Sequence, residues 1–297
     1  MMNRRHFIKK SAALLAAGSI AGQEMYASDL AKRNKGRIGL QLWSVRPDLS
    51  KDFVGTLKKI SEIGYSAIET FFKEDKFFGH TMKEINVITK DLGMSVSGTA
   101  YQISDFLPEN FNAPEWDNWK RCAEDMHTVG AKWAVQASLP GYYVKNMDEL
   151  KRAETYFHLA GEFCKQNGLK FGFHTHEQDF DTVDGVRILD YLIQKTNPKQ
   201  VFFQLEMINA LLVGIDPLQY MLKYPKRFPL WHASDYDLEN KKIVGVGNGS
   251  TNYPALFDKA KAIGLEQLTV ELHFGDDRLA LCKSAFDYFK QFKWTKV

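Results

Sequence analysis

The chain has 297 residues, of which 44% are hydrophobic and 25% are charged, values typical of a globular protein large enough for one α/β barrel. Its formal net charge is +3, and residues 1–27 hold four basic side chains and one acidic one, so the rest of the chain is formally neutral. A neutral body lacks the basic surface with which proteins contact nucleic-acid phosphates, which argues against a nucleic acid as partner.

Residues 1–27 have the pattern of an export signal. Arg4 and Arg5 precede a largely apolar stretch over residues 11–21, which is too short to span a bilayer and is followed by small residues. This pattern resembles a bacterial twin-arginine signal and predicts a periplasmic protein. No cysteine follows the apolar stretch, so we expect no stable membrane anchor. The candidate cleavage positions follow Ala21 and Ala27.

After a short polar linker over residues 28–37, strand-like and helix-like segments alternate to residue 292. The strand-like segments are short and almost continuously apolar, as expected for strands buried on both faces. They cover residues 38–43, 67–70, 95–98, 133–136, 169–174, 201–206, 228–232 and 268–271. The helical patterns cover residues 53–63, 82–92, 116–129, 147–167, 185–195, 217–224, 254–263 and 279–292. Several end in a glycine, where a helix commonly needs a positive φ: Gly64, Gly93, Gly130, Gly168 and Gly264.

Eight strands alternating with eight helices predict a single domain over residues 28–297, an α/β protein of the closed (β/α)8 TIM barrel type. The alternative is an open dinucleotide-binding sheet, which requires a Gly-x-Gly-x-x-Gly turn after the first strand. The segment at that place, LWSVRP over residues 42–47, contains no glycine. The closed barrel is therefore favoured.

Acid or imidazole side chains end four of the later strands, 32, 26 and 39 positions apart: His174, Glu206, His232 and Glu271. Because the strands of a parallel barrel point their C-terminal ends at one mouth, we expect these side chains to converge. A lone buried histidine is more often an ordinary core residue, but a buried unpaired carboxylate is costly. Two carboxylates and two imidazoles predict a site for one divalent metal ion, which could be Mn²⁺, Co²⁺, Zn²⁺ or Mg²⁺.

Several short segments occur together in an order that resembles one known family. They are IGLQLWSVR at 38–46, IE at 68–69, FHTH at 173–176, LE at 205–206, WHASD at 231–235, VGVG at 244–247 and VE at 270–271. On these segments the chain resembles the xylose isomerase-like TIM-barrel family of sugar phosphate isomerases and epimerases, as an exported bacterial member. The resemblance covers about residues 36–292.

The resemblance implies one divalent ion, held by Glu206, His232, Glu271 and a fourth ligand from the fifth strand. The epimerases of the family usually have Glu at that fourth position and Asp in place of Glu206. Here the fourth position is His174, and His176 lies two residues on, facing the same side of an extended chain. Either imidazole can be the ligand, with the other left to act as a base.

Four further residues are candidates for substrate binding around the mouth. Trp43 and Tyr101 offer aromatic faces that suit the C–H faces of a sugar, although packing under loops explains them equally well. Glu69 ends the second strand and could approach substrate from the other side. Asp235 follows His232 by three positions and could orient an imidazole or bind a hydroxyl, or be a loop acid in solvent.

These residues predict a sugar isomerase or epimerase that removes a proton next to a carbonyl and passes through an enediolate stabilised by the metal. Glu271, Glu206 and His176 are the candidates for moving the proton. A histidine where epimerases carry a second carboxylate weakens a symmetric two-base scheme. The alternative is therefore a lyase that performs β-elimination on a 3-keto-glycoside at the same site. An exported protein is also less suited to phosphorylated sugars.

Two other classes are less favoured by the sequence. Apurinic endonucleases of the same superfamily use a richer metal cluster and a basic DNA-binding face, which this neutral chain lacks. A non-catalytic sugar-binding barrel would keep the aromatic mouth but would not need all four strand-end ligands. We therefore expect a small-molecule carbohydrate as the substrate, and the sequence leaves the oligomeric state open.

Overall fold

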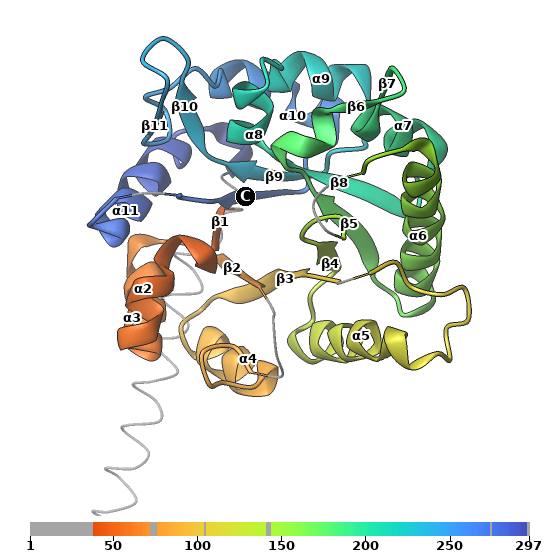
Figure 1. The fold of residues 1–297 in the computed structure, drawn as a ribbon. Helices are drawn as coiled ribbons and strands as arrows, with labels where there is room; N and C mark the ends of the chain where they lie inside the picture. The colour runs from red at the N-terminus through yellow and green to blue at the C-terminus, as the bar shows by residue number, and fades with distance from the viewer. Residues whose placement is uncertain (1–37, 72–75, 104, 141–143, 274, 296–297) are drawn as a thin grey trace, which may run out of the picture.

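The computed structural model describes residues 38–71, 76–103, 105–140, 144–273 and 275–295. The predicted signal over residues 1–27 and the linker that follows lie outside the described residues. Within the described ranges, no helix combines the length and the apolar character needed to cross a membrane. Figure 1 shows the strands at the centre of the molecule and the helices around them.

Eight parallel strands close into a barrel, each pairing with the next barrel strand along the chain. The first strand pairs with both the second and the last, which closes the circle. The strands are β1 (Ile38–Gln41), β2 (Ala67–Phe71), β3 (Ser95–Tyr101), β4 (Trp133–Gln136), β5 (Lys170–His174), β8 (Val201–Glu206), β9 (Leu230–Ala233) and β12 (Gln267–Val270). The predicted (β/α)8 TIM barrel is confirmed.

Helices follow the strands and cover the outside of the barrel (Figure 1). They are α3 (Phe53–Ile63), α4 (Met82–Asp91), α5 (Asp117–Val129), α6 (Met147–Gln166), α7 (Ile188–Lys195), α9 (Pro217–Lys223), α10 (Tyr253–Ile263) and α11 (Arg278–Phe289). Gly64, Gly130 and Gly264 are the C-caps of α3, α5 and α10 and have positive φ. This explains the glycines predicted at the helix ends, because any other residue would be strained at a positive φ.

The loops at the carboxyl ends of the strands contain small elements that the sequence patterns did not predict. They include η1 (Leu42–Val45), α2 (Arg46–Lys51), η3 (Glu177–Phe180), α8 (Met207–Leu212), and the hairpins β6 (Thr182–Val183) with β7 (Val186–Arg187) and β10 (Asp235–Asp237) with β11 (Lys242–Val244). The first strand is shorter than expected because the Gln41 side chain accepts a hydrogen bond from Trp43 N and begins a 3-10 turn. The helix expected from residue 185 begins at Ile188, because the preceding residues pair in the β6–β7 hairpin.

Buried polar side chains gather at one end of the barrel. Apolar residues form the packing between the strands and helices, and every residue of β1, β4 and β9 is buried. The buried polar residues of the barrel strands lie at or beyond the middle of their strands and include Gln41, Glu69, Gln136, His174, Gln204, Glu206 and His232. Burial of polar groups is costly, so their concentration at the carboxyl ends indicates a functional site at this mouth of the barrel.

Candidate metal centre

The four strand-end residues of the sequence prediction lie together at the mouth. His174 and Glu206 end β5 and β8, His232 lies in β9, and Glu271 directly follows β12. One potential ligand atom from each of the four lies within 4.8 Å of the others. All four residues are buried. The cluster therefore has the residue types, proximity and shielding of a divalent metal site.

Two atoms of this cluster are buried without hydrogen-bond partners. Oε1 of Glu206 accepts from Ser234 Oγ and, at 3.4 Å, from Ile208 N, whereas Oε2 has no hydrogen bond. Nδ1 of His232 has none either, although it lies 2.7 Å from Oε2 of Glu271 and 3.5 Å from Oε2 of Glu206. Unsatisfied buried polar atoms are costly. One cation between them would satisfy both, so these residues fit a divalent metal ion.

The charges around the cluster are strongly coupled. Burial, assisted by the nearby imidazoles of His232 and His176, lowers the pKa of His174 to about 3. The ring is therefore neutral and able to ligate at physiological pH. Burial also opposes a charge on His232, but the carboxylates of Glu69, Glu206 and Glu271 outweigh it and raise the His232 pKa well above its ordinary value. Without metal, a proton on His232 neutralises part of this negative charge.

The pKa of Glu206 is shifted in the opposite direction to that of His232. Burial raises the pKa of its carboxyl group, but the imidazoles of His232 and His273 outweigh burial and hold the pKa below its ordinary value. Glu206 is therefore ionised despite its complete burial. An ionised carboxylate with one uncommitted oxygen is a suitable metal ligand.

Glu69, a predicted substrate-binding residue, lies beneath the cluster with both carboxylate oxygens engaged. Oε1 accepts from Gln41 Nε2 at 2.8 Å and contacts His232 Nε2 at 2.9 Å, and Oε2 accepts from Gln204 Nε2 at 2.9 Å. Only 1% of Glu69 is exposed. These contacts favour a role in supporting His232 over the predicted contact with substrate.

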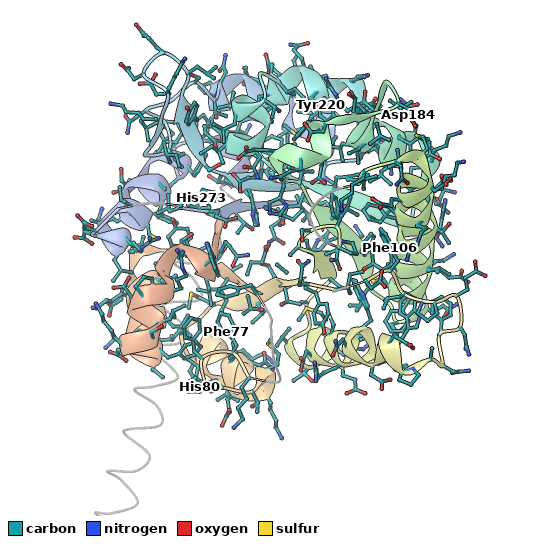
Figure 2. All side chains as sticks on the ribbon, viewed as in Figure 1. Phe77, His80, Phe106, Asp184, Tyr220 and His273 are labelled. Carbon is teal, nitrogen blue, oxygen red and sulfur yellow. The ribbon has the colours of Figure 1, made fainter. Side chains whose placement is uncertain are left out.

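Two more imidazoles lie beside the cluster. The ring of His176 is 4.9 Å from that of His174, and the His176 backbone N–H donates to Asp179 Oδ2 at 2.7 Å. Nε2 of His273 lies 3.8 Å from Oε2 of Glu206, and 29% of its side chain is exposed. The position of His273 can be followed in Figure 2. Burial opposes a charge on His273, but Glu206 and Glu271 raise its pKa to about 9.

Sequence reasoning missed His273 as a site residue. A signal was nevertheless available, because His273 follows Glu271 by two positions, just as His176 follows His174. Residues two apart in an extended chain face the same side. The same rule that selected His176 therefore also selects His273.

The two aromatic candidates differ in exposure. Trp43 is 38% exposed, and its ring packs against the edge of Phe71 and beneath the Arg46 guanidinium, 4.1 Å from the ring centroid. Tyr101 is only 6% exposed and its ring packs 5.7 Å from that of Trp119. Of the two, Trp43 has the accessible surface that stacking on a sugar requires.

Asp235 holds the loop after β9 together. Its Oδ1 accepts from the backbone N–H groups of Tyr236 and Thr251, at 3.0 and 3.1 Å, and its Oδ2 from those of Gly247 and Gly249, at 2.9 and 3.0 Å. Only 1% of Asp235 is exposed. Four backbone donors use the capacity of a carboxylate, so this placement favours loop ordering over the predicted contact with substrate. These bonds hold the loop segment over residues 247–251 in place.

Fold and site together define a (β/α)8-barrel protein with a buried His/Glu cluster at the carboxyl mouth. The sequence model of the family described as xylose isomerase-like TIM barrel matches residues 57–292 of this chain. The chain belongs to this family, as the sequence resemblance predicted.

Known relatives of the chain include sugar-processing enzymes. An inosose dehydratase of Geobacillus kaustophilus is 24% identical over 195 residues, and this match spans 60% of either chain. A sugar phosphate isomerase/epimerase of Parabacteroides distasonis is 26% identical and superimposes with a TM-score of 0.75, covering 88% of this chain and 96% of that one. A 3-keto-D-glucoside 4-epimerase of E. coli shares the fold, with 16% identity, a TM-score of 0.64, and coverage of 86% and 100%.

Proposed function

We propose that this protein is a divalent-metal-dependent sugar isomerase or epimerase that moves a proton on the carbon next to a carbonyl. The observation that carries the proposal is the buried cluster of two carboxylates and two imidazoles, in which Glu206 Oε2 and His232 Nδ1 have no hydrogen-bond partner. Relatives named as isomerases and epimerases support the substrate class. The ligands would be His174, Glu206, His232 and Glu271.

A bound divalent ion would supply positive charge that acidifies the C–H group next to a carbonyl and stabilises negative charge on the substrate oxygens. The protein must then move the proton. Glu271 is slightly more exposed than Glu206, at 7% against 0%, and His176 and His273 border the cluster at partly exposed positions. We assign proton transfer to Glu271 and these two imidazoles, and assign Glu206 to holding the ion.

A second candidate reaction is β-elimination, as in a 3-keto-glycoside lyase. Two observations favour it: the β5 ligand position is His174 rather than a carboxylate, and one relative is named as a dehydratase, an enzyme that eliminates water. In this reaction the base removes the proton next to the carbonyl, and the electron pair forms a carbon–carbon double bond as the bond from the β-carbon to the leaving oxygen breaks. The leaving oxygen then receives a proton. We assign the His273 imidazolium as that proton donor, on its position beside Glu206.

One experiment separates the two reactions. The purified protein is loaded with Mn²⁺ or Co²⁺ and incubated in D₂O with free ketoses, aldoses and 3-keto-glycosides, and the products are followed by NMR. Isomerisation or epimerisation would incorporate deuterium into a sugar that keeps all its substituents, whereas elimination would release the aglycone. Glu271→Gln should lose either activity. Bound metal with neither reaction in the wild type would favour a non-catalytic sugar-binding barrel.

We also propose that residues 1–27 direct export to the periplasm, on the twin-arginine pattern. Fractionation of cells that produce the full chain tests this. The mature protein should occur in the periplasm, and Arg4→Lys/Arg5→Lys should retain the uncleaved precursor in the cytoplasm. The same distribution of the wild type and the Arg4→Lys/Arg5→Lys variant between cytoplasm and periplasm would contradict the proposal.

A further inference from the structure

Beneath the cluster, three buried side chains form a chain of hydrogen bonds across the barrel. Gln41 on β1 donates to Glu69 on β2, which also accepts from Gln204 on β8. The two ends of this chain reach the imidazoles: His232 Nε2 contacts Glu69 at 2.9 Å, and His174 Nδ1 contacts Gln204 Oε1 at 3.0 Å. The three residues are between 0% and 3% exposed, so water does not compete for these bonds.

We infer that Glu69 and Gln204 are positioning residues that set the tautomers of the two imidazoles, so that one nitrogen of each ring offers its lone pair to a metal ion. The inference rests on the proposed metal-dependent function. It concerns residues below the ligands and predicts which ring nitrogen carries a hydrogen.

The argument begins with Glu69, because an ionised carboxylate only accepts hydrogen bonds. The atom of Gln204 that faces Glu69 must therefore be the amide nitrogen, which leaves the amide oxygen facing His174. An oxygen requires a donor, so Nδ1 of His174 carries the hydrogen. Nε2 of the same ring then retains its lone pair.

The same carboxylate determines which nitrogen of His232 carries the hydrogen, and here it is Nε2 rather than Nδ1. Because Oε1 of Glu69 faces Nε2 of His232, that nitrogen carries a hydrogen. Once the ring is neutral, the lone pair is on Nδ1, the atom that lies between Glu206 and Glu271 without a hydrogen bond. One connected network thus places hydrogens on different nitrogens of two rings whose centroids are 4.7 Å apart. Such outer hydrogen bonds fix the orientation and basicity of ligating imidazoles.

Glu69→Gln tests the inference with almost no change in shape. Its amide oxygen can replace Oε1 and still accept from Gln41 and His232. Its amide nitrogen would replace Oε2 and face the amide nitrogen of Gln204, so two donors would oppose each other. Gln204 would have to turn its amide, which presents a donor to His174 Nδ1 and moves the ring hydrogen to Nε2. We expect Zn²⁺ affinity, measured by competition with a chromophoric chelator, to fall about 10–100-fold.

The exchange variant Glu69→Gln/Gln204→Glu should restore binding. The amide nitrogen at position 69 then donates to the carboxylate at position 204, which accepts from His174 Nδ1 again. The charge and the atom count of the pair are unchanged. We expect Zn²⁺ affinity within a few-fold of wild type, and failure of the exchange to improve on Glu69→Gln would overturn the inference.

Gln41→Met is the matched control, because the Gln41 side chain belongs to the network but its hydrogen bonds within the described structure are to Glu69 and Trp43, not to an imidazole. It should lower the melting temperature while changing Zn²⁺ affinity less than about threefold. An equal loss of affinity in Gln41→Met and Glu69→Gln would show that the network only stabilises the fold, and would overturn the inference.

A measurement on the metal-free protein separates this inference from the proposed function. Long-range ¹H–¹⁵N NMR of histidine-labelled protein distinguishes Nδ1–H from Nε2–H rings. Wild type should show His174 as the Nδ1–H tautomer, Glu69→Gln should show Nε2–H, and the exchange variant should return to Nδ1–H. An unchanged His174 signal in Glu69→Gln would refute the inference, whereas absence of metal binding by the wild type would refute the proposed function alone.

Discussion

Nδ1 of His232 lies 2.7 Å from Oε2 of Glu271, although 39 positions separate the two residues in the chain. The pair is brought together because β9 and β12 are neighbours in the barrel, with Thr269 beside His232 in the register. Despite this short distance Nδ1 makes no hydrogen bond. Oε2 of Glu206 lies 3.5 Å from the same nitrogen, so the imidazole and the two carboxylates lie around one point, the arrangement that a shared cation requires.

Removal of Glu206 should abolish metal binding. Wild-type protein is expected to hold about one divalent ion per chain, and Glu206→Ala almost none, because one charged ligand of four is lost. Saturating metal should raise the wild-type melting temperature by several degrees, because a ligand at about 100 times its Kd adds about 2.7 kcal/mol. The melting temperature of Glu206→Ala should not respond.

Elemental analysis and thermal melts with and without metal check this prediction. Glu266→Ala is the matched control, because this glutamate immediately precedes β12, and its partly exposed carboxylate binds Lys170 Nζ at 2.8 Å. It should bind metal like wild type. Equal metal content in Glu206→Ala and wild type would exclude the cluster as the binding site.

Asp179 should make stability depend on pH. Burial raises the pKa of its carboxyl group from 3.8 to about 7, although the bond from the His176 backbone N–H opposes this shift. Because the folded pKa is raised, the stabilising contribution is complete below about pH 4 and is lost as pH rises through about 7. The loss is on the order of 4 kcal/mol at most.

Asp179→Asn removes this titration while keeping an oxygen that can accept from His176 N. Chemical denaturation of both proteins between pH 4 and pH 8 checks the effect. The free energy of unfolding of wild type relative to Asp179→Asn should decline as pH increases between about 4 and 7, and should level off above pH 7. A difference that does not vary with pH would contradict the raised pKa.

Asp235→Ala should loosen the loop that follows β9. It leaves four backbone N–H groups without their carboxylate acceptor, and we expect a loss of about 2–4 kcal/mol in the free energy of unfolding, because some donors will find water. Limited proteolysis should cut within residues 239–250 sooner than in wild type.

Asp237→Ala is the comparison for this loop, since Asp237 accepts from exposed backbone N–H groups of Glu239 and Asn240. It should cost less than about 1 kcal/mol. If Asp235→Ala instead left stability unchanged and raised KM for a sugar substrate, the sequence prediction of substrate binding would be correct.

Arg227 should contribute to stability but not to metal binding. Its buried guanidinium donates to Ile193 O, Thr196 Oγ1 and Val201 O, at the start of β8 and β9, away from the carboxyl ends of those strands. Arg227→Met should lose about 2–4 kcal/mol, because buried acceptors are left unpaired. Denaturant unfolding and metal analysis check this prediction. Loss of metal binding at unchanged stability would contradict it.

The amino-acid sequence alone predicted the barrel and the convergence of the four strand-end residues. Apolar runs, helical periodicity and glycine C-caps are local signals, and eight repeats of them permit few arrangements. Once the strands are parallel and closed, residues that end them must meet at one mouth. His174, Glu206, His232 and Glu271 could therefore be grouped without knowledge of their distances.

Only the tertiary structure decided what Glu69, Asp235 and His273 contact. Glu69 lies 135 positions from its partner Gln204, and the side of the barrel on which each side chain lies depends on strand register. Asp235 was assigned to the mouth by its position, but the loop after β9 folds back and surrounds its carboxylate with backbone donors. Such contacts depend on how distant segments pack, because no local pattern of residues specifies which buried donor meets which acceptor.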